Sequence, residues 1–507
     1  MVDIFGQVAV QLFTLQNLFF AVASVFLGII IGAIPGLTVT LGIILLLPMT
    51  YGMTPITAIV ALLGIYVGGC YGGSISAILI NIPGTNSALA TTLDGYPLAV
   101  QGKANKALST SLFASCVGGF LGSLILLFAA QPIATLAMKC RSPEYFSLAL
   151  FGLTVIAGVS GDSIVKGLIS ACVGIFISCI GLESLTGTLR YTFDSMLLFS
   201  GVSLLPALIG LIALTQVLIK SVEEKRAVAQ ASNVNFVEKL NDPPINGAER
   251  RSIMKTILKS TGIATIIGAM PGAGGGVASF LSYNEARRSS KHPEEFGKGS
   301  LEGIAAAESS NNTVVGSAMI PLLTLGIPGD GVTAILLGAF ILHGMQPGPK
   351  LFTDQAVETY SIIVGLVICN IILYVLGRLC TKQISRIINI SYKILGSAIA
   401  LFCFAGAFAN SGSIYEMILI VPLAIVGYYL GLLGFSVIPM MLGLILGPIV
   451  EVNFTRSMIV SFGDPLIFFK EPVSCIILVF ALIFTILVMK MNKKMELDNP
   501  ETEGLSE

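Results

Sequence analysis

The sequence is poor in charge. Lys, Arg, Asp and Glu make up 11% of its 507 residues, and the formal net charge is +0, which gives no case for nucleic acid binding. The only two histidines, His292 and His343, lie far apart in the chain, so a metal site built on histidine is not expected. The nine cysteines form no C-x-x-C pair, and we interpret them as small buried apolar side chains.

Two further motifs are missing. The first four residues, Met1–Ile4, carry no basic group, so a cleavable signal peptide is not expected. No Walker A motif is present, which argues against ATP hydrolysis as the energy source. What the chain has instead is apolar surface: 54% of its residues are hydrophobic and the mean hydropathy is +0.90. A soluble domain cannot bury that much, so the sequence predicts an all-α polytopic membrane protein.

Pro-Gly pairs recur at matched positions inside strongly apolar stretches. Gly32–Gly36 recurs as Gly268–Gly272, and Asn81–Thr85 recurs as Gly326–Asp330. Proline removes a backbone N–H and glycine permits a positive φ, so each pair breaks a helix. In a bilayer an interrupted helix is tolerated only where protein or a water-filled cavity surrounds it. Paired breaks in two halves predict an inverted-repeat secondary transporter with discontinuous helices and its site at the breaks.

The polar segments orient the chain, because Lys and Arg favour the cytoplasmic side. The segments 221–255 and 284–300 are both rich in Lys and Arg, so both should be cytoplasmic. The apolar stretch 256–282 between them therefore cannot cross once, and its two short arms predict a re-entrant hairpin with a glycine-rich tip. The matching stretch 16–49 is followed by an uncharged loop, which favours the outside, so the halves are expected to be inverted. Against this, Lys139, Arg141 and Arg190 fall on loops that should be external.

We expect about 10–14 membrane segments in two repeats. The first membrane repeat should span 1–220, followed by a cytoplasmic linker over 221–255. The second repeat, with additional helices, should span 256–491, and an acidic cytoplasmic tail should occupy 492–507.

Candidate ligands gather around the breaks. Opposed half-helix N-termini suit a carboxylate, and exposed carbonyl groups suit a cation such as Na⁺. The predicted substrate-binding residues are Pro35, Gly36, Ser74, Asn81, Pro83, Gly84, Thr85, Gly272, Gly274, Asn312, Pro328 and Gly329. The predicted residues for cation coupling are Gly36, Asn81, Asn311 and Asp330. No catalytic residue and no cofactor other than a coupling Na⁺ or H⁺ is expected.

Several of these features have plainer interpretations. The glycines at 68, 69, 72 and 73 suit close helix packing as well as a cavity wall, and the two are compatible. The polar run Glu308–Thr313 belongs either at membrane depth or to the cytoplasmic loop. Asp330 is either a cation or proton site or an interfacial loop residue. The segment Asp94–Pro97 has the composition of a turn.

The chain resembles the large membrane subunit (TctA type) of tripartite tricarboxylate transporters. In the first half the resemblance rests on Tyr71–Ile75, Asn81–Thr85, Asp94–Pro97 and Gly102-Lys103-Ala104. In the second half it rests on Ser290–Glu294, Glu302-Gly303, Glu308, Asn311-Asn312, Leu323–Gly329, His343-Gly344 and Pro347–Pro349. The resemblance covers roughly residues 15–490. Asp330 departs from it, because family members often have a hydroxyl or small residue there.

The resemblance implies secondary active import of organic di- or tricarboxylates such as citrate across the bacterial inner membrane, driven by Na⁺ or H⁺. The implied partners are a small multi-helix membrane subunit, a periplasmic solute-binding protein and the lipid bilayer; homo-oligomerisation stays open. Elevator-type movement of a hairpin-bearing core is the expected mechanism. The alternatives are an ion or solute channel and an intramembrane enzyme, and the inverted repeat argues against both.

Overall fold

The computed structural model describes residues 2–35, 37–159, 163–183, 186–199, 201–227, 242–384 and 392–498. Within them the chain is almost wholly helical, and its one sheet is the short antiparallel pair β1 (Gly181–Leu182) and β2 (Leu189–Arg190). Seven of the described helices are long and apolar enough to cross a membrane, and five shorter apolar helices accompany them. The predicted fold class, an all-α polytopic membrane protein, is therefore confirmed.

The chain forms two contact units. The larger, here called the Pro-Gly unit, comprises Met1–Ala137 and Leu208–Ile425 and holds all four breaks. The smaller, here called the small unit, comprises Met138–Ala207 and Val426–Glu507. These units follow contacts, whereas the boundaries expected at 220, 255 and 491 follow repeats in the sequence, so those boundaries stay predictions.

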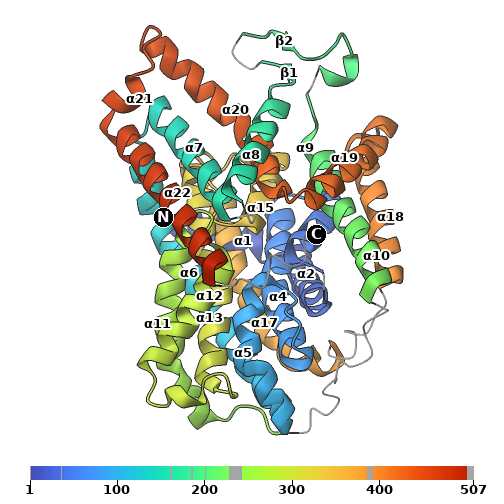
Figure 1. Cartoon of the computed structure of the whole chain (residues 1–507), viewed down its shortest axis with the longest axis vertical. Helices are drawn as coiled ribbons and strands as arrows, with labels where there is room; N and C mark the ends of the chain where they lie inside the picture. Colours follow the sequence, from blue (N-terminus) through green and yellow to red (C-terminus); the bar gives the residue numbers. More distant parts are fainter. Residues whose placement is uncertain are drawn as a thin grey trace. The chain divides into compact units, whose positions relative to one another are not determined.

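The first half of the Pro-Gly unit is built around two parallel helices. Its elements are α1 (Val2–Leu12), α2 (Leu15–Ala33), α3 (Val39–Leu46), η1 (Leu47–Thr50), α4 (Pro55–Ile80), η2 (Asn86–Ala88), α5 (Leu89–Leu98), η3 (Ala99–Lys103) and α6 (Ala104–Ala137) (Figure 1). A Cβ on Gly28 would lie 2.7 Å from the carbonyl oxygen of Ile65, and one on Gly68 would lie 3.0 Å from the amide nitrogen of Ile29. Backbones approach this closely only where side chains are absent, as in small-residue packing.

The glycine-rich face of α4 serves both of the purposes considered for it. Gly68 and Gly72 pack against the backbone of α2. Gly69 and Gly73 instead face Val39 and Thr85, which follow the two breaks of this half. The helix therefore packs closely on one side and lines the breaks on the other.

The second half repeats this arrangement. Its elements are α11 (Gly247–Ala269), α12 (Gly274–Ser289), η6 (Pro293–Glu295), α13 (Leu301–Ser317), α14 (Met319–Leu325), α15 (Gly331–Leu342), α16 (Leu351–Asp354) and α17 (Ala356–Ile384). Helices α11 and α13 run parallel, as α2 and α4 do: Ile257 packs with Ala305, and further along Ser317 donates to the carbonyl of Ala264. In Figure 1, α11, α12 and α13 lie together in the yellow-green part of the chain.

Helices α11 and α12 form the hairpin that the charge pattern predicted. Lys259 on α11 and Glu285 on α12 form an ion pair at 2.7 Å, although the tip of the hairpin lies about midway between them in sequence. The arms are therefore antiparallel and leave the hairpin at the same end. The first arm is longer than predicted, because a capping box between Asn246 and Glu249 starts α11 inside the polar segment.

The two halves are inverted relative to each other. The side-chain amide of Asn311 donates to the carbonyl of Cys70 at 3.2 Å. Glu308, three residues before Asn311 on α13, faces the hydroxyl of Ser74, four residues after Cys70 on α4. Residues later in α13 therefore contact residues earlier in α4, so these two equivalent helices are antiparallel. This is the geometry of an inverted-topology repeat.

The remaining helices flank these repeats or build the small unit. In sequence order they are α7 (Ser142–Val159), α8 (Ile164–Ser178), η4 (Met196–Leu198), α9 (Leu204–Leu208), η5 (Ile209–Leu214), α10 (Thr215–Ala227), α18 (Tyr392–Ser411), α19 (Ile414–Leu432), α20 (Val437–Val460), α21 (Ile467–Lys470) and α22 (Pro472–Asp498). Within the small unit, Arg190 binds both carboxylate oxygens of Glu451, at 2.5 and 3.0 Å. This bidentate pair joins β2 to α20. Since the positive-inside rule counts Lys and Arg and not net charge, Arg190 still weighs against the predicted topology.

Candidate functional site

Three of the four breaks have a backbone that only glycine or a short polar residue adopts easily. Helix α4 ends at Asn81, which has φ 58° and ψ 24°, in the left-handed region. Helix α14 ends at Gly326 with φ 72°, the equivalent position in the second half. At the hairpin tip, Gly272 and Gly274 have φ 82° and 64°. The Pro-Gly pairs therefore end helices at the predicted places. Gly36, predicted for both substrate and cation binding, lies outside the described residues.

Within each half, the two breaks touch. The amide of Gly84 donates to the carbonyl of Gly73 at 3.2 Å, and a Cβ on Gly84 would overlap the carbonyl oxygen of Gly32. In the second half, the amide of Gly272 donates to the carbonyl of Gly329 at 2.7 Å. A glycine at these positions is required by the close approach of backbone to backbone.

The breaks of the two halves also meet each other. A Cβ on Gly275 would lie 3.0 Å from Cβ of Ser87, and one on Gly276 would lie 3.6 Å from the carbonyl oxygen of Asn86. A Cβ on Gly274 would lie 3.6 Å from Cβ of Asp330, whose carboxylate accepts a hydrogen bond from Tyr66. Tyr66 and Gly73, which contact the breaks, occupy the middle of the 26-residue helix α4. The breaks are therefore packed against the same long apolar helix, and their depth in a membrane stays a prediction.

Four short helices begin at this place, in two side-by-side pairs. In one pair, α12 and η2–α5 start together and stay together as far as Tyr283, whose hydroxyl donates to Asp94 at 2.9 Å. In the other pair, α3, continued by η1, ends beside α15: the side chains of Thr50 at the end of η1 and of His343 after α15 are 2.9 Å apart. Each pair takes one helix from each half, as an inverted repeat requires.

The two pairs differ in their caps. Thr38 caps α3, accepting from the amide of Leu41, and Asp330 caps α15 in a capping box with Thr333. Neither α12 nor η2 has a side-chain cap. The amide groups at the starts of α12 and η2 therefore make no side-chain cap hydrogen bond and keep their partial positive charge. Asp330 and Oδ1 of Asn311 are acceptors beside the first turn of α12. The first turn of α12 is Gly274-Gly275-Gly276, which leaves its backbone uncovered.

Asp330 is the charged group nearest to the breaks. One carboxylate oxygen accepts from the amide of Thr333 at 2.7 Å, and the other accepts from the hydroxyl of Tyr66 at 2.5 Å. The side chain is partly exposed rather than sealed in the protein. Its position at a helix start explains its packing, and its remaining lone pairs leave room for a cation.

The predicted polar ligands separate into two groups. Asn311 reaches the breaks: its Oδ1 is buried, has no hydrogen-bond partner among the described residues, and would lie 3.6 Å from a Cβ on Gly275. Asn312 faces the other way, toward Gly119 on α6, and both of its amide atoms are buried without a partner among the described residues. Ser74 is buried and bonds to Ser111 at 2.6 Å. The remaining predicted residues, Pro35, Asn81, Pro83, Gly84, Thr85, Gly272, Gly274, Pro328 and Gly329, all lie at the breaks.

Glu308 is a buried charged residue close to the breaks that is not among the predicted site residues. It lies inside α13 and is fully buried, so it does not belong to the cytoplasmic loop. Its carboxylate accepts hydrogen bonds from Thr91 and, at 2.8 Å, from Ser115, and the hydroxyls of Ser74 and Ser111 also face it. A buried carboxylate without an ion-pair partner in the described chain is costly unless hydroxyl groups satisfy it. The sequence does contain a signal for this buried position: Glu308 is an acidic residue in the middle of a helix of mostly apolar and small residues.

The segment Asp94–Pro97 is not a turn, contrary to its composition. It lies within α5, and Asp94 is fully buried. One carboxylate oxygen accepts from three backbone amides, those of Gly297, Gly299 and Ser300, at 2.8–2.9 Å. Asp94 thus joins α5 to the loop before α13, while Asp330 is bound by Tyr66 and Thr333. The two aspartates serve separate structures, and the geometry gives no support to an aspartyl dyad.

Comparisons with known proteins agree with this architecture. Residues 18–442 match the tripartite tricarboxylate transporter TctA family. The chain is 35% identical over 474 residues to an uncharacterised 52.8 kDa protein in the TAR-I ttuC′ 3′ region of Agrobacterium vitis, with 93% of each chain covered. It is 37% identical over 225 residues to an uncharacterised protein in the TAR-II ttuC′ 3′ region of the same organism, covering 93% of that protein and 44% of this chain. No solved structure matches. The chain belongs to the TctA family, the membrane component of tripartite tricarboxylate transporters.

Proposed function

We propose that this chain carries organic di- or tricarboxylates, such as citrate, into the cell across the bacterial inner membrane, driven by a Na⁺ or H⁺ gradient. A periplasmic solute-binding protein delivers the substrate, and a small multi-helix membrane subunit completes the complex. The family normally works with such partner subunits. The C-terminus is cytoplasmic in this proposal, because Lys490, Lys493 and Lys494 follow the last apolar stretch.

The observation that carries the proposal is the meeting of two helix starts without side-chain caps. The amides of α12 and η2 point their partial positive charge into one place, beside Gly275 and Ser87. Neither Lys nor Arg occurs in the break segments 32–36, 81–87, 268–276 and 326–330. A carboxylate in this place is recognised by backbone amides alone, as at other helix N-termini.

The capped pair of helices suits a cation instead. Asp330 places a carboxylate at the start of α15, and a Cβ on Gly274 would lie 3.6 Å from its Cβ. The Oδ1 of Asn311, which has no partner among the described residues, would lie 3.6 Å from a Cβ on the next residue, Gly275, so it borders both proposed ligands. Oxygen ligands of this kind, with carbonyl groups at unwound backbone, suit Na⁺. An anion on the uncapped pair and a cation on the capped pair would attract each other. Each ligand then raises the affinity of the other by the same factor.

Elevator-type movement is supported by the location of the breaks. All four lie in the Pro-Gly unit, with their described mutual contacts made inside it. A site contained in one unit moves intact when that unit moves, which is what alternating access by an elevator requires.

The test is uptake by the purified complex in proteoliposomes. Mono-, di- and tricarboxylates should be offered in turn under an imposed Na⁺ or H⁺ gradient. Concentrative uptake of one class, dependent on one gradient, is expected. Flux that runs down the substrate gradient whatever the cation gradient would favour a channel, and chemical conversion of the substrate would favour an enzyme.

Cation linkage gives a second, equilibrium test. Substrate affinity of the detergent-purified complex should rise with Na⁺ or with falling pH. The Asp330→Asn variant, which keeps side-chain size but removes the charge, should lose that dependence. An affinity that ignores both cations in the unmodified protein would contradict the proposed pairing of charges.

A further inference from the structure

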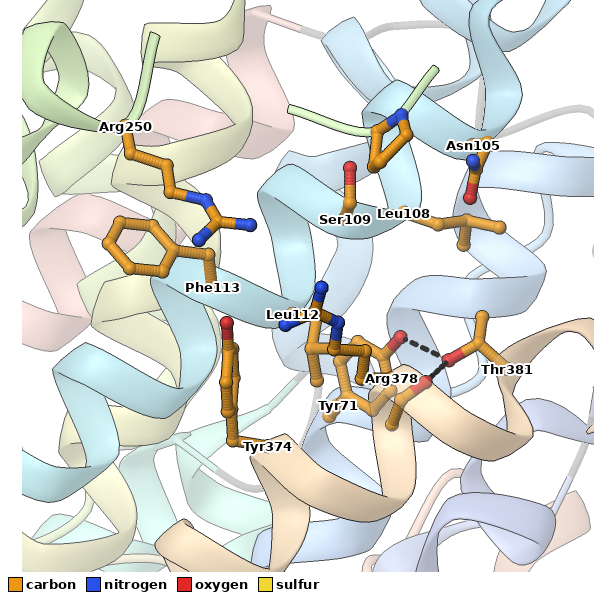
Figure 2. A pocket seen from close by; sticks show the side chains of 12 residues that line it. Tyr71, Asn105, Leu108, Ser109, Leu112, Phe113, Arg250, Tyr374, Arg378 and Thr381 are labelled. Atoms are coloured by element: carbon orange, nitrogen blue, oxygen red, sulfur yellow. Dashed lines mark hydrogen bonds between the residues drawn. The ribbon is translucent and has the colours of Figure 1, made fainter. Parts of the chain in front are cut away.

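A cavity lies in the Pro-Gly unit, apart from the breaks. It has a volume of about 270 Å³ and lies between α6, α17 and the first turn of α11 (Figure 2). None of the break residues lines it. One end of the cavity is closed by a hydrogen bond between the hydroxyls of Tyr71 and Thr381 at 2.9 Å, drawn in Figure 2.

Three side chains that line this cavity, Arg250, Tyr374 and Arg378, carry hydrogen-bond donors that pair with no acceptor in the described part of the chain. Figure 2 shows the guanidinium groups of Arg250 and Arg378 and the hydroxyl of Tyr374 directed toward the same space. Neither arginine forms an ion pair within the described chain, and Nε of Arg250 is buried without a hydrogen-bond partner. Arg250 rests on the ring of Phe113, 5.4 Å from its centroid, which holds its guanidinium group in place.

The acidic residues nearest to Arg250 in the sequence, Asp242 and Glu249, already bind other groups. The carboxylate of Asp242 accepts from the amides of Asn105 and Lys106, both at 2.8 Å, at the start of α6. Glu249 pairs with Lys106 at 2.8 Å. The amide of Asn246 and the Lys106 ammonium together hold the pKa of Glu249 below its usual value. Among the described residues, therefore, no carboxylate pairs with either arginine.

The surroundings of the cavity are those of a membrane surface. On α17, Val375 and Leu379 turn outward with 51% and 66% of their surfaces exposed, beside Arg378. Leu108, Leu112 and Phe113 supply an apolar wall. The cavity lies at the end of the unit where α6 and α11 begin, the end that the positive-inside pattern assigns to the cytoplasm. Basic cavities between membrane helices on this side suit anionic lipid headgroups.

We propose that this cavity binds the phosphate group of an anionic phospholipid from the cytoplasmic leaflet. Arg250 and Arg378 bind the phosphate oxygens, since the guanidinium fork matches phosphate geometry, and Tyr374 donates a further hydrogen bond. The acyl chains lie along Val375 and Leu379. The lipid thus bridges α6 of the first half to α11 and α17 of the second half.

The experiment adds phosphatidylglycerol to the delipidated, purified protein and measures its binding by native mass spectrometry. The double variant Arg250→Ala/Arg378→Ala should bind the tightest lipid at least ten times more weakly. The matched control is Arg251→Ala/Arg288→Ala, which removes the same charge from exposed side chains outside the cavity. That control should bind as the unmodified protein does. Transport activity is not needed, so the outcome is independent of the transport proposal.

Further arms identify the ligand. The two double variants should bind phosphatidylethanolamine with the same acyl chains equally well. Inorganic phosphate or citrate that displaces phosphatidylglycerol at equal concentration would overturn the lipid assignment in favour of a soluble anion. If the double variant does not fold, Tyr374→Phe removes one donor alone and should weaken phosphatidylglycerol binding. Binding unchanged by Tyr374→Phe and by Arg378→Ala would also overturn the proposal.

Discussion

Replacing Gly329 by alanine tests whether the breaks must approach each other as closely as they do. A Cβ at Gly329 would lie 2.7 Å from both Cα and Cβ of Ala318 and 2.9 Å from its carbonyl oxygen. Carbon atoms in contact normally lie about 3.5–4.0 Å apart, so the break must move away by about 1 Å. That movement also disrupts the 2.7 Å hydrogen bond between Gly272 and Gly329.

The cost follows from these two effects. Overpacking in a dense interior costs about 1–3 kcal/mol, and a lost hydrogen bond costs about 0.5–1.5 kcal/mol. Together they come to roughly 2–4 kcal/mol, which corresponds to a roughly 30- to 1,000-fold loss in kcat/KM if the transport state needs the observed geometry. Uptake in proteoliposomes measures the loss, and size-exclusion chromatography checks assembly.

Gly262→Ala is the matched control. Gly262 is exposed on α11, and a Cβ there would have nothing within 4 Å. The control should transport normally, with a helix stabilised by up to about 1 kcal/mol. Normal uptake by Gly329→Ala, with the hairpin intact, would refute the idea that the meeting of the breaks forms the transport site.

Other predictions concern buried and capping groups. Glu308→Ala should lower the stability of the purified protein by roughly 1–3 kcal/mol, because Thr91 and Ser115 lose their acceptor, and thermal unfolding should show Glu308→Gln much closer to the unmodified protein. Asp330→Ala should cost about 0.5–2 kcal/mol through the lost cap, seen in the same assay; no change would contradict the capping role. A cysteine at Ser290 should react with an impermeant reagent only from the cytoplasmic side, and strong labelling in intact spheroplasts would exclude the re-entrant hairpin.

The breaks could be predicted from the sequence because their cause is local. Proline and glycine end a helix through their own covalent structure, whatever packs around them. The matched order of the pairs then implied a repeat, and the spacing of Lys and Arg implied inversion. The start of α11 was missed because a capping box competes with polarity: Asn246 and Glu249 satisfy each other's backbone amides and extend the helix beyond the apolar stretch.

The polar partners could not be predicted, because they come from distant parts of the chain. Glu308 is satisfied by Thr91 and Ser115, each about 200 residues away, and nothing near Glu308 reveals them. The sequence predicted Asn312 for the substrate and Asn311 for the cation, both at one site. Adjacent residues on a helix point about 100° apart, however, so Asn311 faces the hairpin tip and Asn312 faces α6. Asp94 is held in α5 by amides of a loop that follows 200 residues later.

The inverted repeat explains where a site can form, and the caps explain what it can hold. Symmetry alone would place the same chemistry on both pairs of helices, because each pair takes one helix start from each half. Thr38 and Asp330 occupy the acceptor positions of one pair and cancel its positive ends, while α12 and η2 have no such acceptor. A single acidic side chain at Asp330 is therefore sufficient to make one pair attractive to cations, and its absence at η2 leaves the other attractive to carboxylates. In the proposed coupled transport of a carboxylate, the charge asymmetry would come from residues at these helix starts, since the break segments contain no Lys or Arg.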